Sequence, residues 1–433
     1  MILLTNGTIL NFNPARVEKN SDVAVDGKKI IAIGQQLSVQ YPNAETIDLK
    51  GKIVMPGLVC SHNHFYSSLA RGILAKIKSA DNFMEVLENL WWKLDRALDE
   101  EILYYSGMIG TLEAIKCGAT AVIDHNASPN FIKGSLSVLN KCFKHNGLRG
   151  ILCYEITDRN GDEGTKAGLE ESLNFTESVK ENALVEAAIG GHAPFTLSDD
   201  SLKSISEIVN KTGKGIHIHV GEDKYDADHS EEKYSKSLLE RLDSFNLLND
   251  KAILVHGVWL NEKDLKILNE RDSFLVHNPR SNMNNNVGYF KSITEANNLA
   301  IGTDGIGADM FEETRFAYFK SQEENQNLNP SDFVTYLWNG NKILARYFKQ
   351  KFGRIENDYI ADLIILDYNS PTPLTNENAA GHFIFGFSSQ NVESVIINGK
   401  FVYRDRSFPF EIKKIYDESR RAASKLWKRM DEL

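Results

Sequence analysis

The sequence predicts an α/β fold: a (β/α)8 barrel of the TIM type, joined to a small β-sandwich domain that both ends of the chain build. Two observations lead to this fold class. Between residues 58 and 350, short apolar runs alternate with helical patterns about eight times. On either side of that region, apolar runs follow one another without helices. An open doubly wound sheet is the alternative, but the chain has neither Gly-x-Gly-x-x-Gly nor a Walker-type phosphate loop.

The first 55 residues predict short strands, at residues 1–12, 23–33 and 45–49. Asp26-Gly27 is a typical hairpin signal. Strands return at residues 361–367, 392–398 and 400–403, with a turn at Asn398-Gly399. Residues 1–55 and 354–410 are therefore predicted to form one composite small β-domain, and residues 411–433 a C-terminal helix.

The barrel is expected to span residues 56–353. Its eight predicted strands are residues 58–62, 119–124, 150–154, 184–190, 215–219, 252–256, 273–277 and 300–303. The helices expected between them are residues 99–117, 135–146, 170–182, 199–212, 235–245, 262–269 and 293–298. Residues 320–332, rich in Gln, Asn and Glu, are predicted to be a solvated loop.

Composition excludes some classes of protein and partner. The 433-residue chain has a formal net charge of −10, which argues against coating nucleic acid or an anionic membrane. Its four cysteines form no Cys-x-x-Cys pair, a pattern typical of free thiols in a reducing cytoplasm. The start lacks the features of a signal peptide, and no apolar run approaches the roughly 20 residues of a membrane span. We expect a cytoplasmic protein that acts on a small molecule.

Histidines gather where the predicted barrel strands end. Side chains alternate along a strand, so His62 and His64 point the same way. Active sites of such barrels are built at the carboxyl ends of the strands. The other residues at or just beyond these ends are His125, His192, His219, His256, His277 and Asp304.

Three imidazoles and one carboxylate suit a catalytic metal site of the zinc type, which keeps one position for water. His62, His64, His219 and Asp304 supply that set. The metal lowers the pKa of bound water from about 16 toward 7, and a general base should lie nearby. Glu222, three residues after His219, is the best-placed carboxylate, although a surface position is the alternative.

The sequence predicts the positions and roles of other residues near this set less specifically. His217 shares its strand face with His219 and is predicted to be hydrogen-bonded one layer further down. Asp223 and Asp226 are expected to be solvated. Asp124 and His125 are predicted to face the pocket, with a hydrogen-bonded pair at the strand end as the alternative. Trp92 could stack on a flat substrate ring or pack in the core.

The motifs together resemble the amidohydrolase superfamily, in its cytosine/guanine deaminase and chlorohydrolase-like branch. They are Pro56-Gly57-Leu58, His62-x-His64, His219-x-x-Glu222, Val255-His256-Gly257, His277-Asn278-Pro279-x-Ser281-Asn282 and Gly302-Thr303-Asp304-Gly305. Finer features, such as Trp91-Trp92-Lys93-Leu94-Asp95, resemble the aminohydrolase group called SsnA. The segment after Asn282, Met283-Asn284-Asn285-Asn286, departs from the branch.

The resemblance implies one divalent metal, zinc or iron, held by His62, His64, His219 and Asp304. The fourth strand has no lysine to bridge a second metal. Asp304 would accept a water proton, Glu222 would shuttle a proton to a ring nitrogen, and His256 would orient the water. His192 would contact substrate, and family habit points to a homodimer.

The first functional hypothesis is a metal-dependent aminohydrolase, in which metal-bound hydroxide attacks a C–N carbon of a small nitrogen heterocycle and ammonia leaves. The second hypothesis keeps the site but changes the bond, to a cyclic amide or a carbon–chlorine bond. The third is a non-catalytic binding protein. The intact set of Glu222, His256 and Asp304 argues against the third.

Overall fold

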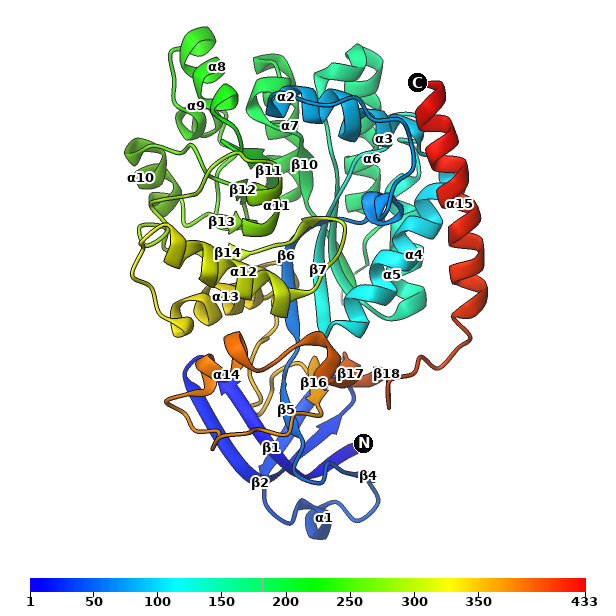
Figure 1. The fold of residues 1–433 in the computed structure, drawn as a ribbon, viewed down its shortest axis with the longest axis vertical. Coiled ribbons are helices and arrows are strands. Elements are labelled where there is room, and N and C mark those ends of the chain that lie inside the picture. The colour runs from blue at the N-terminus through cyan, green and yellow to red at the C-terminus, as the bar shows by residue number, and fades with distance from the viewer. Residues whose placement is uncertain (181–182) are drawn as a thin grey trace.

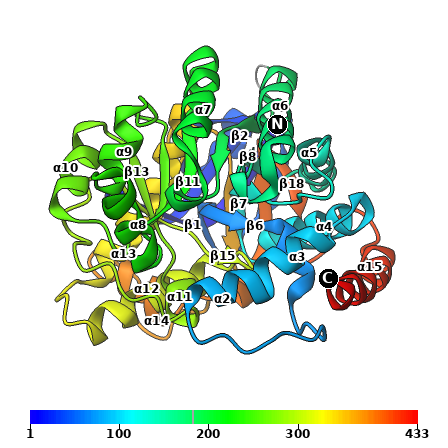
Figure 2. The same ribbon diagram turned by 90° about the horizontal axis from the view of Figure 1, so that it is seen from above.

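The computed structural model describes residues 1–180 and 183–433. Figure 1 shows a helix-covered barrel above a smaller β-domain, with the last helix along the outside of the barrel. Seen from above in Figure 2, the helices surround the barrel strands. The predicted fold class is confirmed. Within the described residues, we find no helix that combines the length and apolarity needed to cross a membrane.

The small domain is built on one eight-stranded sheet of order β18-β17-β16-β5-β1-β2-β3, with β4 paired to β1. Its strands are β1 (Ile2–Phe12), β2 (Ala15–Asp26), β3 (Lys29–Gly34), β4 (Glu45–Asp48), β5 (Ile53–Pro56), β16 (Leu363–Leu366), β17 (Val392–Ile397) and β18 (Lys400–Tyr403). Strand β5 pairs antiparallel with β16, which places Val54 opposite Ile365. The two ends of the chain thus share one sheet; the exact domain limits stay a proposal.

The barrel consists of two five-stranded parallel sheets. Their strands are β6 (Leu58–His64), β7 (Ala119–Asn126), β8 (Arg149–Tyr154), β9 (Val185–Ala187), β10 (Ile189–Gly191), β11 (Ile216–Val220), β12 (Ile253–His256), β13 (Phe274–His277), β14 (Leu299–Ile301) and β15 (Asp304–Gly305). Two of the predicted strands are each split into a pair. β9 pairs with β8 and β10 with β11, while β14 pairs with β13 and β15 with β6, so the ring closes.

The split in the fourth strand has a steric reason. A Cβ atom on Gly190 would lie 2.1 Å from the carbonyl oxygen of Tyr154, so the backbones of β10 and β8 approach more closely there than a side chain permits. At the eighth strand, the backbone N–H of Thr303 donates to the carbonyl oxygen of His62 at 3.0 Å. This bond links the end of β14 to β6, so Asp304 is carried to the rim beside the first strand.

Six of the seven helices that the sequence predicts between the barrel strands are present. The long helices are α4 (Glu100–Lys116), α5 (Ser135–Asn146), α6 (Gly161–Ser178), α7 (Asp199–Thr212), α8 (Lys224–Tyr234), α10 (Glu262–Glu270), α12 (Met310–Glu323), α13 (Pro330–Phe348) and α15 (Lys413–Glu432). The short ones are α1 (Leu37–Gln40), α2 (Phe83–Val86), α3 (Trp92–Ala97), α9 (Leu238–Ser244), α11 (Pro279–Asn284) and α14 (Ala379–Phe385). Asp99, for example, caps α4 by accepting from the backbone N–H of Ile102 at 2.9 Å.

The helix and loop predictions need correction in several places. Residues 293–298 form turns, because the segment is too short to sustain a helix between two loops. The long helices α8, α12 and α13 are not among the predicted helices, and the sequence of α8 has few apolar residues. Helix α6 begins nine residues earlier than predicted, and residues 181–182 of the predicted range lie outside the described residues. The predicted loop at 320–332 is shorter, because α12 extends to Glu323 and α13 begins at Pro330.

Candidate metal centre

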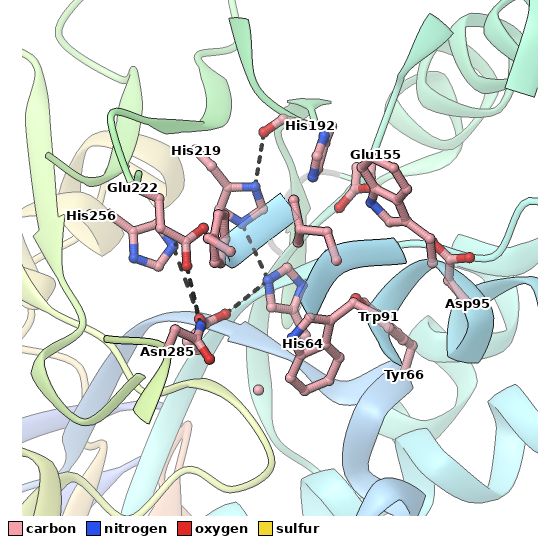
Figure 3. A pocket seen from close by; sticks show the side chains of 15 residues that line it. His64, Tyr66, Trp91, Asp95, Glu155, His192, His219, Glu222, His256 and Asn285 are labelled. Atoms are coloured by element: carbon pink, nitrogen blue, oxygen red, sulfur yellow. Dashed lines mark hydrogen bonds and ion pairs between the residues drawn. The ribbon is translucent and has the colours of Figure 1, made fainter. Parts of the chain in front are cut away.

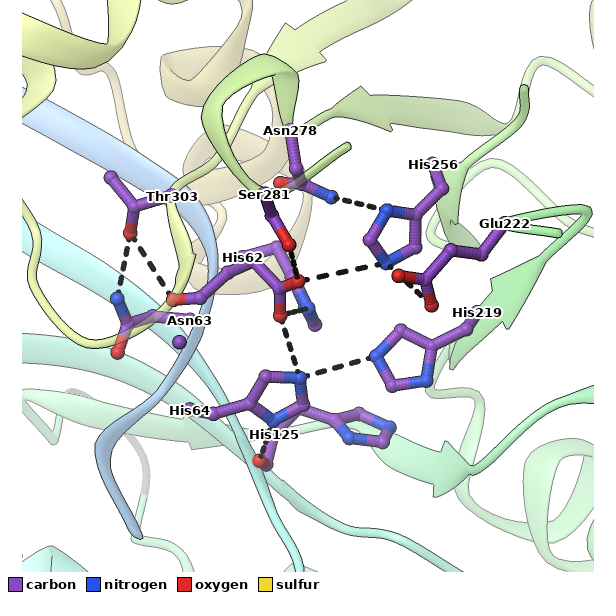
Figure 4. A network of polar contacts seen from close by, with 12 residues as sticks. His62, Asn63, His64, His125, His219, Glu222, His256, Asn278, Ser281 and Thr303 are labelled. Carbon is purple, nitrogen blue, oxygen red and sulfur yellow. Dashed lines mark hydrogen bonds and ion pairs between the residues drawn. The ribbon is translucent and has the colours of Figure 1, made fainter. Parts of the chain in front are cut away.

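His62 and His64 lie at the end of β6, on one face of the strand as predicted, and Figure 4 shows both in one cluster with His219 and Glu222. The Nε2 atom of His64 lies 3.0 Å from Asp304 Oδ1, and that of His62 lies 3.4 Å from the same oxygen. Both histidines are buried. The first and eighth strands therefore deliver two imidazole nitrogens to one carboxylate oxygen.

His219, at the end of β11, brings a third imidazole to this point. Its Nε2 lies 3.2 Å from His64 Nε2. Each ring already has a carbonyl acceptor on its other side: His64 Nδ1 lies 2.6 Å from His125 O, and His219 Nδ1 lies 2.8 Å from His192 O. A carbonyl only accepts, so each Nδ1 carries the proton and each Nε2 presents a lone pair.

These lone pairs converge with the Asp304 carboxylate, an arrangement that is repulsive unless a cation lies between them. Within the described chain, His62 Nε2 is buried and has no hydrogen-bond partner. Imidazole nitrogens oriented by backbone carbonyls are the usual ligands of Zn²⁺ and similar ions. The donor set therefore fits a divalent metal.

His217 lies one layer below this cluster, as predicted. Its Nε2 is 2.9 Å from His62 Nδ1, and its Nδ1 is 3.4 Å from the Sγ of Cys153. The side chain is fully buried and does not line the cavity. His217 thus orients the His62 ring from behind.

Asp304 is held in an unusual backbone conformation, with a φ of 59° in the left-handed region. The hydroxyl of Ser281 donates to its Oδ2 at 2.5 Å. Burial opposes ionisation of Asp304, but interactions with the neighbouring His62 and His64 side chains outweigh it and hold its pKa well below the ordinary value. The carboxylate is therefore ionised and fixed at the rim.

Glu222 and His256 lie beside Asp304. The Nε2 of His256 is 3.4 Å from Glu222 Oε2 and 4.0 Å from Asp304 Oδ2. Burial, and next the charge of Asp304, raise the pKa of Glu222 well above its ordinary value. The amide of Asn285 donates to Glu222 Oε1 at 3.4 Å, so the segment that departs from the family pattern reaches this carboxyl group.

His256 presents its Nε2 to the cavity because its other nitrogen is occupied. The amide oxygen of Asn282 lies 2.8 Å from His256 Nδ1, so that Nδ1 carries the proton. Among the described residues, His256 Nε2 is a buried atom with no hydrogen-bond partner. A lone pair thus faces the space between Glu222 and Asp304.

A cavity opens above the cluster, and Figure 3 shows its side chains. His64, His219, Glu222, His256 and Asp304 all line it. The predicted substrate-binding residues His192 and Trp92 line it as well. Their roles stay predictions, but both lie where a bound ring would contact them.

His125 does not line this cavity, and the expectation that it faces the pocket is corrected. The ring is fully buried behind the cavity wall. Its Nε2 faces the carbonyl oxygens of Gly191 and His217, at 3.1 and 3.2 Å. The neighbouring Asp124 is also buried and accepts from the backbone N–H of Phe65 at 2.7 Å. The alternative reading, hydrogen-bonded residues at a strand end, describes this pair.

Three acidic residues were missed or misjudged from the sequence. Glu155 and Asp95 line the cavity, and Arg159 forms ion pairs with both. Asp95 ends the Trp91-Trp92-Lys93-Leu94-Asp95 motif, which implied no role for it, and Glu155 belongs to none of the motifs found in the sequence. Asp226, expected to be solvated, is buried and accepts from the backbone N–H groups of Phe195 at 3.0 Å and Gly221 at 2.8 Å.

The chain is similar to known proteins over most of its length. The sequence profile of the amidohydrolase family matches residues 53–402. The chain is 31% identical over 411 residues to a 5-methylthioadenosine/S-adenosylhomocysteine deaminase of Thermococcus sibiricus, covering 93% of each protein. It is 30% identical over 421 residues to a 5'-deoxyadenosine deaminase of Methanocaldococcus jannaschii, covering 93% of this chain and 95% of the relative.

Solved structures show the same fold. An adenosine deaminase from Xanthomonas campestris with bound zinc superposes with a TM-score of 0.86 at 23% identity, over 99% of this chain and 98% of that one. Guanine deaminase of E. coli superposes with a TM-score of 0.81 at 17% identity, over 93% of this chain and 100% of the other. At these identities the likeness concerns the fold alone.

Proposed function

The chain belongs to the amidohydrolase family, and we propose that it is a metal-dependent aminohydrolase, which removes an amino group from a small nitrogen heterocycle and releases ammonia. It is a hydrolase of carbon–nitrogen bonds other than peptide bonds. The observation that carries the proposal is the convergence of the His64 and His219 Nε2 atoms on Asp304, beside Glu222, whose Oε2 lies 3.4 Å from His256 Nε2.

His62, His64, His219 and Asp304 would hold one divalent ion, zinc in the first instance. The zinc-containing fold neighbour and the nitrogen-rich donor set both support zinc. When bound, the ion would act as a Lewis acid and make water a nucleophile near neutral pH. The chain's own residues then handle the protons.

Water adds to the ring carbon that bears the amino group. Glu222, whose raised pKa keeps it protonated, gives its proton to the adjacent ring nitrogen. Asp304 takes one water proton and passes it to the amino group, which leaves as ammonia. Glu222 regains a proton from the added hydroxyl group, and the ring nitrogen keeps its proton in the lactam product. His256 holds the water through its unprotonated Nε2.

The test is ammonia release by zinc-reconstituted protein over a panel of aminopurines, aminopyrimidines and aminopterins. The names of the relatives make 6-aminopurines and their nucleosides the first compounds to try. Turnover should disappear in Asp304→Asn and His219→Ala. Retained turnover and zinc content in both variants would disprove the proposal.

The alternative reactions use the same residues, so the released product separates them. A chlorinated heterocycle would release chloride, and a cyclic amide would open without ammonia. Assaying chloride and ring opening alongside ammonia on matched substrates therefore decides which bond is broken.

A further inference from the structure

The cavity has a second chemical feature, on the side away from Glu222 and His256. There Glu155 and Asp95 face the cavity from the other wall (Figure 3). Glu155 follows β8 directly, and its side chain is only 4% exposed. The residue has no part in the chemistry proposed above, so its buried carboxylate needs another explanation.

The carboxylate of Glu155 is incompletely satisfied by the protein. Its Oε1 lies 3.4 Å from the Nη2 of Arg159, and its Oε2 lies 3.4 Å from the Nδ1 of His125. Both contacts are long, whereas a carboxylate has about four acceptor sites. Arg159 also pairs with Asp95, so its guanidinium is shared between the two carboxylates. The carboxylate of Glu155 can therefore accept a further hydrogen bond from a molecule in the cavity.

Glu155 stays ionised despite its burial. Burial opposes ionisation, but electrostatic interactions with the His192, His125 and Arg159 side chains outweigh it and hold the pKa of Glu155 below its ordinary value. An ionised carboxylate that lines a cavity prefers a hydrogen-bond donor and disfavours an anion. Asp95 adds a second carboxylate, while Arg159 is the one guanidinium shared between them.

Glu155 lies close enough to the reacting centre to contact the substrate ring itself, rather than a substituent far from the ring. Ligand atoms of Glu155, His192 and His219 lie within 4.8 Å of one another. His219 in turn points at the convergent cluster, with its Nε2 3.2 Å from that of His64. A heterocycle whose reacting carbon lies at that cluster would thus place its own ring edge against Glu155.

We propose that Glu155 is a specificity-determining residue that accepts a hydrogen bond from a ring N–H of the substrate. The substrate class is an amino-substituted heterocycle that also carries a ring N–H, such as a lactam or imidazole N–H. This inference rests on the proposed function, since it describes the substrate of the same site. Anionic substituents at this edge are excluded by Glu155 and Asp95.

The experiment compares ring N–H groups with their N-methyl counterparts. Guanine is assayed against its 1-, 7- and 9-methyl derivatives, and adenine against 9-methyladenine, with zinc-loaded protein. Methylation of one particular ring nitrogen should lower kcat/KM by about tenfold or more, as expected for a hydrogen bond to a charged group. In Glu155→Ala, the ratio of kcat/KM for the unmethylated compound to kcat/KM for its methylated counterpart should fall to within about twofold of 1.

Two further variants keep the test interpretable. Glu155→Gln preserves volume and should give an intermediate ratio, so it replaces the alanine variant if that variant does not fold. Glu186→Gln is the matched control, because Glu186 lies on β9, pairs with Lys214 at 2.5 Å and does not line the cavity. This control should keep the wild-type ratio.

A binding measurement separates this inference from the proposed function. The affinities of the lactam products xanthine and hypoxanthine, and of their N-methyl derivatives, are measured by calorimetry without turnover. Binding that depends on a ring N–H and on Glu155, without ammonia release, would support the subsite and disprove the aminohydrolase. Turnover that no methylation and no Glu155 variant affects would overturn the subsite alone.

Glu155, His192 and His219 could instead hold a second cation, and metal analysis tests this directly. One zinc per chain, unchanged in Glu155→Gln, is the expected result. Two ions per chain, falling to one in Glu155→Gln, would overturn the proposal, because the carboxylate would then be a metal ligand.

Discussion

The Nε2 atoms of His64 and His219 lie 3.2 Å apart, although the other nitrogen of each ring already donates its proton to a backbone carbonyl. Two facing lone pairs next to an ionised Asp304 define a place for a cation. The convergence of these two lone pairs beside Asp304, more than the identity of the residues, determines how the protein should respond to metal.

Zinc should therefore raise the melting temperature of chelator-treated protein. An ion that binds only the folded state stabilises it by about 4 kcal/mol at a concentration 1,000-fold above Kd, which corresponds to a rise of a few degrees or more. Differential scanning fluorimetry with and without zinc measures the shift. His219→Ala should lose most of it, because one nitrogen ligand is gone. An equal zinc shift in this variant would contradict the assignment.

Glu222→Gln should abolish most turnover while leaving the metal in place. Glutamine keeps the size of the side chain but cannot deliver a proton to the substrate, and general acid–base catalysis contributes about 10²- to 10⁴-fold. Ammonia release and zinc content are measured together. Asp228→Asn is the matched control, since Asp228 is exposed and pairs with Lys224 on the outside of α8. Loss of zinc in Glu222→Gln would instead indicate a ligand role.

Asn282 should act by positioning His256. Its amide oxygen accepts from His256 Nδ1 at 2.8 Å, which fixes the tautomer whose Nε2 faces the cavity. Asn282→Ala is expected to lower kcat by about 10- to 100-fold, with a smaller change in KM. Asn282→Asp retains an acceptor and should recover part of kcat and alter the pH profile. A change confined to KM would point to substrate contact instead.

The main parts of the site could be predicted because they follow a local rule. An apolar run that ends in a polar residue marks the carboxyl end of a buried strand, and parallel strands bring those ends together. His62, His64, His219, His256 and Asp304 all obey this rule, and the structure gathers them at one rim.

Other parts depend on contacts that no local pattern contains. Asp95 and Arg159 are 64 positions apart in the chain and pair only because α3 and the turn after β8 meet at the barrel mouth. The splits in the fourth and eighth strands depend on how neighbouring backbones pack around the closed ring. His125 follows the strand-end rule, yet its ring lies against those of His217 and His219, at centroid distances of 4.8 Å, and does not line the cavity.

Asp226 is buried, not solvated as the sequence predicts. Its burial leads to a prediction about the free energy of unfolding. Its carboxylate accepts the backbone N–H groups of Phe195 and Gly221, and so ties the loop after β10 to the loop after β11. Asp226→Ala would leave two buried donors without a partner and should lower the free energy of unfolding by about 2–4 kcal/mol. Urea denaturation measures the loss, and Asp228→Ala, on the exposed face of the same helix, should change it little.

The loss in Asp226→Ala should depend on pH in a definite direction. Burial raises the pKa of Asp226 to about 7, whereas an unfolded aspartate titrates near 3.9. The folded state therefore binds this proton more tightly, and the stability contributed by Asp226 is full below about pH 4 and is lost as pH rises through 7. The alanine variant lacks this titration, while the other groups titrate in both proteins. The difference in unfolding free energy between wild type and Asp226→Ala is thus expected to be larger at pH 5 than at pH 8. An equal difference at both values, or a larger one at pH 8, would show that Asp226 is ionised in the folded protein well below neutral pH.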